Sequence, residues 1–187
     1  MLEVEMNYQE FLKSKQKRII ESGFDCKKLN SHLFPFQEFI VKRALKAGKY
    51  AIFADTGLGK TIMQLEWAYQ VALHTKRPIL ILAPLAVTTQ TIEEGDKFNI
   101  KVKRYKDFNG KGIYISNYEQ LDNIDTDPFV GIVLDESSIL KNFNGKYRTQ
   151  IINTFVNTPY KLACTATPSP NDPMELGNHA QFLDVMS

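Results

Sequence analysis

Residues 54–61 read Ala-Asp-Thr-Gly-Leu-Gly-Lys-Thr, and they lie between a short apolar run at 50–54 and a helical pattern over 60–74. The glycines at 57 and 59 permit backbone conformations that a Cβ disfavours, so successive amide N–H groups can surround phosphate oxygens. A helix that begins near Lys60 adds the positive end of its dipole. This strand, glycine-rich turn and helix predict a phosphate-binding loop, in a variant form with Ala54 where the general pattern has glycine.

The residue types of this loop also predict what it binds. Lys60 would reach the β and γ phosphates of a nucleotide as a point charge, and the Thr61 hydroxyl would coordinate Mg²⁺. A nucleotide with β and γ phosphates, together with Mg²⁺, is therefore the predicted ligand. An incidental glycine-rich turn is the alternative, and the strand and helix on either side argue against it. The candidate nucleotide-binding residues of the loop are Thr56, Gly57, Leu58, Gly59, Lys60 and Thr61.

Strands and helices alternate along the rest of the chain. Predicted strands such as 79–83 and 131–134 are continuously apolar, as expected when helices cover both faces of a parallel sheet. The fold class is therefore α/β, with a mostly parallel central sheet and helices on both faces. Further strands are predicted at 112–116 and 160–164, and helices at 36–47, 87–97 and 147–156. Because ligands bind beyond the carboxyl ends of such strands, polar residues directly after a strand are the candidates for function.

Two adjacent carboxylates, Asp135 and Glu136, follow the apolar strand over 131–135. Asp135 would hold Mg²⁺ through its water shell, and Glu136 would orient and deprotonate an attacking water. By itself an Asp-Glu pair after a strand is more often a solvated loop. The phosphate loop upstream favours the metal interpretation, because a nucleotide-bound Mg²⁺ requires a second carboxylate contact. Lys60, Asp135 and Glu136 are the predicted catalytic residues.

Two more polar groups have both a functional and a structural interpretation. The hydroxyls of Thr165 and Thr167, at the end of the strand over 160–164, could sense the γ-phosphate through hydrogen bonds to the Asp-Glu pair, or they could cap a turn. The amide of Gln37 matches the edge of adenine, but Gln37 could equally be an exposed helix residue.

Composition excludes several classes of protein. The chain has 187 residues, which suits one domain, and a net charge of +2, too small to predict a polyanion partner. No apolar run approaches the roughly 18 residues that cross a bilayer, and the N-terminus lacks the features of a secretory signal, so we expect a cytoplasmic protein without a membrane partner. Cys26 and Cys164 have no metal-binding spacing. The basic stretch over 97–106 is interpreted as a solvated face rather than a DNA-binding patch.

The four polar blocks, in this order, resemble the motifs of the first RecA-like domain of superfamily 2 helicases and translocases. Residues 54–61 look like motif I, 135–138 like motif II and 165–168 like motif III. The extended block over 135–142 is similar to that of Swi/Snf-type ATPases, and the whole chain looks much like Swi/Snf-like helicases encoded by phages and prophages. The resemblance implies a RecA-like P-loop NTPase domain that uses ATP and Mg²⁺ and that has DNA, duplex or single-stranded, as a partner.

The resemblance also implies contacts outside the phosphate loop. Gln37 lies where the family carries its adenine-contacting glutamine, and residues 84–87 and 116–119 look like two motifs associated with nucleic acid. Two departures limit what can be transferred: Ser137-Ser138 replaces an Ala-His pair, and Thr91 stands where many relatives have Trp. The implied nucleic-acid contacts are Pro84, Leu85, Ser116, Asn117 and Tyr118.

By this resemblance, residues 33–187 form the helicase ATP-binding domain, and residues 1–32 form an N-terminal helical extension with a helix predicted over 7–22. The family's second RecA-like domain, with its arginine fingers, has no counterpart here, so we expect a second domain or polypeptide as a partner. Since an arginine finger is worth roughly 10³ to 10⁵ in rate, ATP hydrolysis by this chain alone should be weak. Two alternatives stay open: a nonenzymatic nucleotide-dependent interaction module, and a P-loop small-molecule kinase.

Overall fold

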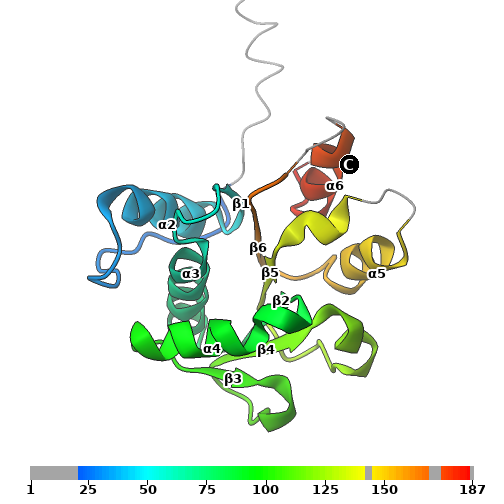
Figure 1. Cartoon of the computed structure of the whole chain (residues 1–187), viewed down its shortest axis with the longest axis horizontal. Coiled ribbons are helices and arrows are strands. Elements are labelled where there is room, and N and C mark those ends of the chain that lie inside the picture. Colours follow the sequence, from blue (N-terminus) through cyan, green and yellow to red (C-terminus); the bar gives the residue numbers. More distant parts are fainter. Residues whose placement is uncertain (1–20, 142–144, 169–173, 186–187) are drawn as a thin grey trace, which may run out of the picture.

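The computed structural model describes residues 21–141, 145–168 and 174–185. In this part of the chain, six strands form one parallel sheet in the order β1-β6-β5-β2-β4-β3 (Figure 1). The strands are β1 (Lys49–Phe53), β2 (Ile79–Ala83), β3 (Val102–Arg104), β4 (Ile113–Asn117), β5 (Gly131–Asp135) and β6 (Tyr160–Thr165). The α-helices are α2 (Pro35–Ala47), α3 (Lys60–Thr75), α4 (Thr88–Lys97), α5 (Lys146–Thr154) and α6 (Met174–Phe182).

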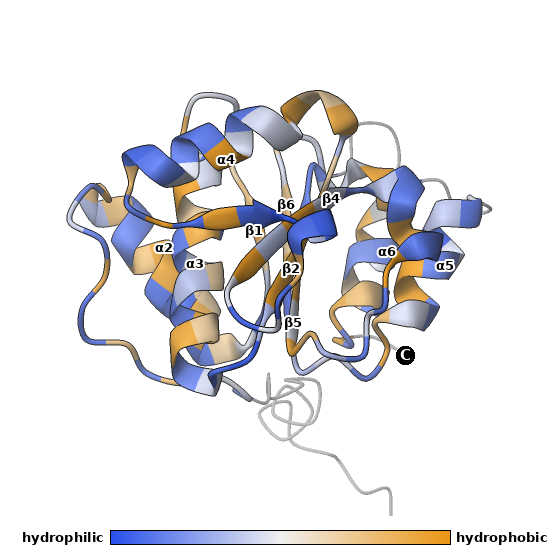
Figure 2. Ribbon diagram, turned by 90° about the horizontal axis from the view of Figure 1, so that it is seen from below, coloured by the Kyte–Doolittle hydropathy of each residue, from blue (hydrophilic) through white to orange (hydrophobic). Residues whose placement is uncertain are grey.

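The sheet separates two layers of helices. Figures 1 and 2 show α2, α3 and α4 on one face and α5 and α6 on the other. Alternate residues of β2 face opposite cores: Ile79 and Ile81 pack with α2 and α3, whereas Leu80 packs with Ile151 of α5 and Phe182 of α6. Since no residue of β2 meets water, the whole strand is apolar. The predicted α/β fold with helices on both faces is confirmed, and all of its strand pairs are parallel.

Some expectations about individual elements differ from the structure. The buried face of α2 contains Val41, Ala44 and Leu45. Phe36 is spaced to share a helical face with Ala44 but is 45% exposed. Neither β3 nor α6 was expected. The helix predicted over 7–22 lies outside the described residues except at 21 and 22, which are not helical. There, the backbone N–H of Ser22 donates to the carbonyl of Ala47, at the end of α2.

No helix in the described ranges combines the length and the apolar character that a bilayer span requires.

Candidate nucleotide-binding site

The predicted phosphate loop connects the end of β1 to the beginning of α3. Gly57 and Gly59 both have the left-handed conformation, with φ of 84° and 74°. A Cβ at Gly59 would lie 2.3 Å from Nε2 of Gln37, whereas a Cβ at Gly57 would meet nothing within 4 Å. Gly59 is followed directly by the 16 residues of α3, so the positive end of a long helix dipole lies at the loop. These features fit a phosphate cradle.

Lys60 lies over this loop. Its Nζ donates to the backbone carbonyl of Ala54 at 2.8 Å and to that of Asp55 at 3.2 Å. Thr61, the next residue of α3, is half-buried. The ammonium group of Lys60 is therefore held at the loop by uncharged carbonyl groups. A bound phosphate group can replace these carbonyls as its hydrogen-bond acceptor.

Gln37 joins the first turn of α2 to the phosphate loop. Its Oε1 accepts a hydrogen bond from the backbone N–H of Phe34, and its Nε2 donates to the carbonyl of Leu58, each at 2.9 Å. The side chain is only 3% exposed, so the alternative of an exposed helix residue is wrong. The predicted contact of Gln37 with adenine stays a prediction.

The two acidic residues lie at the carboxyl end of β5, and Glu136 has a left-handed φ of 55°, uncommon for a residue with a Cβ. Burial raises the pKa of Asp135. The charge of Glu136 adds to this rise, whereas the amide of Gln64 and the ammonium of Lys60 lower the pKa. Lys60 and Asp135, which are 75 positions apart in the sequence, thus lie close enough to interact.

The third predicted block contacts this pair directly. Thr165 Oγ1 donates to Glu136 Oε1 at 2.7 Å, and the backbone N–H of Thr167 donates to Thr165 Oγ1 at 3.1 Å. Thr167 Oγ1 in turn accepts a hydrogen bond from Lys141 Nζ at 2.9 Å. The structure therefore brings Thr165 and Glu136 together at the carboxyl ends of β5 and β6, and it places Thr167 one step further out.

One partner of this region was not predicted. Ser137 Oγ lies 3.0 Å from Nε2 of His179 in the core, and His179 belongs to α6. Both side chains are buried. Their separation of 42 positions leaves no local sequence signal for this contact.

The predicted nucleic-acid contacts divide into three groups. Leu85 is 65% exposed and follows β2, next to half-buried Pro84. Ser116 and Asn117 end β4 and line a pocket. Tyr118 lies in the core at 3% exposure, and its hydroxyl donates to the backbone carbonyl of Asp135 at 2.8 Å. Because this hydroxyl faces the protein, we do not retain Tyr118 as a surface contact.

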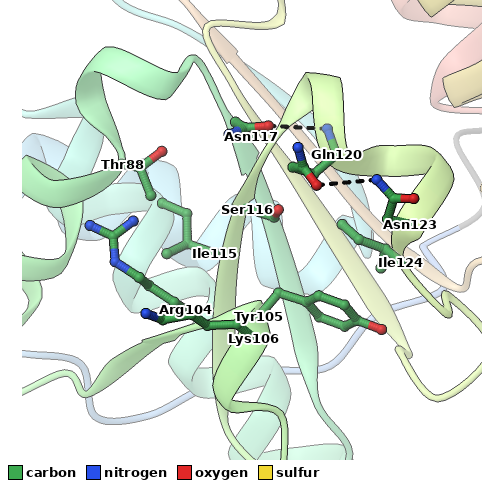
Figure 3. Close-up of a pocket in the computed structure, with 10 residues that line it drawn as sticks. All are labelled: Thr88, Arg104, Tyr105, Lys106, Ile115, Ser116, Asn117, Gln120, Asn123 and Ile124. Carbon is green, nitrogen blue, oxygen red and sulfur yellow. Dashed lines mark hydrogen bonds between the residues drawn. The ribbon is translucent and has the colours of Figure 1, made fainter.

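The pocket beside Ser116 has a volume of about 340 Å³ and contains two cationic side chains (Figure 3). Figure 3 shows Arg104, from the end of β3, and Gln120 on different sides of Ser116. Asn117 Oδ1 accepts a hydrogen bond from the backbone N–H of Gln120 at 3.0 Å. Lys106 also lines the pocket, so part of the basic stretch that was interpreted as a solvated face lies beside the predicted nucleic-acid contacts.

The fold and this site together define a RecA-like P-loop ATPase domain. The family model for the type III restriction enzyme, res subunit, matches residues 12–170, and the chain belongs to this family of helicase-type ATPase domains. The predicted resemblance to superfamily 2 helicases and translocases is confirmed at this level. No curated protein matches the sequence.

Solved structures with the same fold include three helicase-type proteins. The SWI2/SNF2 ATPase core of Sulfolobus solfataricus, solved in complex with dsDNA, matches with a TM-score of 0.72 and 22% identity over 86% of this chain. The UvsW helicase of bacteriophage T4 gives 0.66 and 18% over 95%, and the Hef helicase domain of Pyrococcus furiosus gives 0.63 and 19% over 80%. This chain spans 37%, 66% and 36% of those three chains.

Proposed function

We propose that this chain is the ATP-binding motor domain of an ATP-dependent DNA helicase or translocase of the Swi/Snf type. The supporting observation is the convergence of three segments at the carboxyl ends of β1, β5 and β6. Lys60 of the phosphate loop lies near enough to Asp135 to offset part of the burial-driven rise in its pKa, and Thr165 donates to Glu136. This set of a cationic loop, two carboxylates and a hydroxyl matches what the hydrolysis of a triphosphate requires.

Each residue of the site has a role in this proposal. Lys60 and the loop amides would bind the phosphates, and Gln37 would contact adenine. Thr61 and Asp135 would hold Mg²⁺, which supplies positive charge against the phosphate oxygens when it is bound. Glu136 would accept the proton of a water that attacks the γ-phosphate in line. The hydrogen bond from Thr165 would hold the Glu136 carboxylate in place for this step, so that Thr165 and Thr167 couple the acidic pair to the state of the γ-phosphate.

Two substitutions test the nucleotide site. Lys60→Ala should remove most of the affinity for Mg-ATP, measured by calorimetry, because it deletes the cation that contacts the phosphates. Glu136→Gln should retain ATP binding and lose hydrolysis, since the amide cannot accept the proton. Lys111→Ala, which changes a cation before the amino end of β4, is the charge-matched control. Unchanged ATP affinity in Lys60→Ala would contradict the proposal.

DNA is the proposed partner, and its proposed path follows the pocket at the carboxyl ends of β3 and β4. Ser116 and Asn117 offer polar contacts there, and Arg104 and Lys106 add positive charge. Pro84 and exposed Leu85, which follow the neighbouring strand β2, offer apolar contacts. Titration of a labelled duplex and of a labelled single strand would measure this binding. Equal weakening by Arg104→Ala and by the control Lys111→Ala would argue against a specific path.

We further propose that hydrolysis by these 187 residues alone is slow, and that a second RecA-like domain, on the same or another polypeptide, completes the site. The support is that the chain spans only 37% of the SWI2/SNF2 core. Phosphate release measured with and without duplex DNA should therefore change little. Strong stimulation by DNA would show that the chain carries a complete motor site.

A further inference from the structure

Helix α3 contains a buried side-chain amide that lacks full hydrogen-bond geometry with any partner. Both Nε2 and Oε1 of Gln64 are buried, and neither reaches full hydrogen-bond geometry with any group in the described part of the chain. The amide nevertheless lies near enough to the Asp135 carboxyl to act on it as a weak donor. An unsatisfied amide destabilises a folded protein, and such groups in the core therefore require an explanation. Trp67 Nε1, on the same helix, is the other buried side-chain atom in this condition among the described residues.

The position of Gln64 connects this amide to the nucleotide site. Gln64 follows Thr61 by three positions and Lys60 by four, so its side chain lies on the face of α3 that these two residues share. Asp135 approaches the same face from β5, close enough that the Gln64 amide acts on its carboxyl group. The unpartnered amide is therefore adjacent to both proposed Mg²⁺-binding residues, Thr61 and Asp135.

Gln70, a second buried amide of α3, has a purely structural role, and its contacts differ from those of Gln64. Gln70 Nε2 donates to Glu66 Oε1 at 2.8 Å, and Gln70 Oε1 accepts a hydrogen bond from Cys26 Sγ at 3.3 Å. These contacts attach the segment before α2 to the helix, and Glu66 extends them to the backbone N–H of Asn30. Gln64 joins no such segment, although it is at least as buried.

We propose that Gln64 is a positioning residue for the metal site: its Nε2–H group donates to the Asp135 carboxylate when that carboxylate holds Mg²⁺. The amide then completes the hydrogen bond to Asp135 that falls short of full geometry in this structure, and the carboxylate is oriented from the side of the core. Residues that orient a metal ligand in this way typically contribute 10- to 100-fold to metal affinity, a rough range from other metal sites. This inference rests on the proposed function, in which Asp135 binds Mg²⁺.

The test substitutes Gln64→Leu, which removes the amide and keeps most of the side-chain volume. Affinity for ADP is measured by calorimetry across a Mg²⁺ titration and in EDTA, and stability is measured by urea unfolding without nucleotide. We expect unchanged or higher stability, because an unsatisfied polar group is removed. The gain in ADP affinity that Mg²⁺ provides should fall by roughly 10- to 100-fold, while the affinity in EDTA stays the same.

Gln70→Leu is the matched control, since it removes a buried but partnered amide from the same helix. It should lower the stability and keep the full Mg²⁺ dependence. Gln64→Met, with an unbranched side chain, serves if leucine does not fit the site. Full Mg²⁺ dependence in the Gln64 variants would overturn this assignment while leaving the proposed function intact. If the unsubstituted chain itself shows no Mg²⁺-dependent ADP affinity, the proposed function fails, and the role of Gln64 fails with it.

Discussion

At the scale of single residues, the two glycines of the phosphate loop are required for different physical reasons. Both have positive φ, but only Gly59 lies against a neighbour, the amide of Gln37. Gly57→Ala should therefore cost about 1–2 kcal/mol of unfolding free energy through backbone strain alone. Gly59→Ala should cost more and also weaken ATP binding, because Gln37 must move. Urea unfolding and calorimetry measure the two effects, and equal losses in both variants would contradict this explanation.

Tyr118 allows a second test at this scale. Its hydroxyl donates to the backbone carbonyl of Asp135 from the loop that follows β4. Tyr118→Phe should lower the free energy of unfolding by about 0.5–1.5 kcal/mol, because a buried carbonyl loses its donor. DNA affinity should stay unchanged under conditions in which the variant is fully folded, since the hydroxyl does not face solvent. A large loss of DNA affinity in a variant that unfolds like the unsubstituted chain would show that the Tyr118 hydroxyl contacts DNA.

At the scale of elements, the sequence predicts those strands whose two faces are both buried. The predicted strands over 79–83 and 131–135, which are apolar throughout and apolar up to Leu134 respectively, have the bounds that the structure shows. β3 has only Val102 buried among three residues, within a basic stretch, so no apolar pattern marks it. For the site, each block was visible as a motif, but the partners of Gln37 and Ser137 come from distant segments. Such tertiary contacts leave no periodicity in the sequence.

The turn after α6 depends on one ion-pair cluster. Asp184 accepts hydrogen bonds from Lys161 of β6 at 2.8 Å and from Lys49 of β1 at 2.6 Å, and Lys161 is only 1% exposed. Asp184→Asn would leave the Lys161 ammonium buried without an anion. We expect a loss of roughly 1–3 kcal/mol in the free energy of unfolding, below the full value for a buried pair because Asp184 is partly exposed. Lys42→Ala, which breaks an exposed pair with Glu38, is the control and should change little.

The same cluster predicts that the free energy of unfolding falls at acid pH. Burial alone would raise the pKa of Asp184, but the hydrogen bonds and charges of Lys161 and Lys49 outweigh it and hold that pKa below its usual value. A lowered carboxyl pKa stabilises the fold fully above the unfolded pKa of about 3.9, and this contribution disappears as the pH falls through the lower folded pKa. Unfolding curves at descending pH should show this loss, and the difference between the chain and Asp184→Asn should shrink over that range.

At the scale of the whole molecule, a parallel sheet places every functional segment at one edge. The phosphate loop follows β1, the acidic pair begins at the last residue of β5, and Thr165 is the last residue of β6. Ser116 lies near the end of β4, on the other side of β2. The two halves of this edge are joined by the Tyr118 hydroxyl on Asp135. Tyr118, which directly follows the pocket residues Ser116 and Asn117, therefore connects the proposed DNA path to the backbone of the residue proposed to hold Mg²⁺.

The positions of two cationic side chains allow a test of the proposed DNA path. Arg104 ends β3 at the carboxyl edge, and Lys111 precedes β4 at the amino edge, so the two cations lie at opposite ends of adjacent strands. If DNA follows the carboxyl edge, Arg104→Ala should reduce the slope of log affinity against log salt by about 1, the value for one released counterion. Lys111→Ala should leave the slope unchanged. Fluorescence anisotropy at several salt concentrations measures both slopes, and an equal reduction in the two variants would indicate attraction to the net charge rather than a defined path.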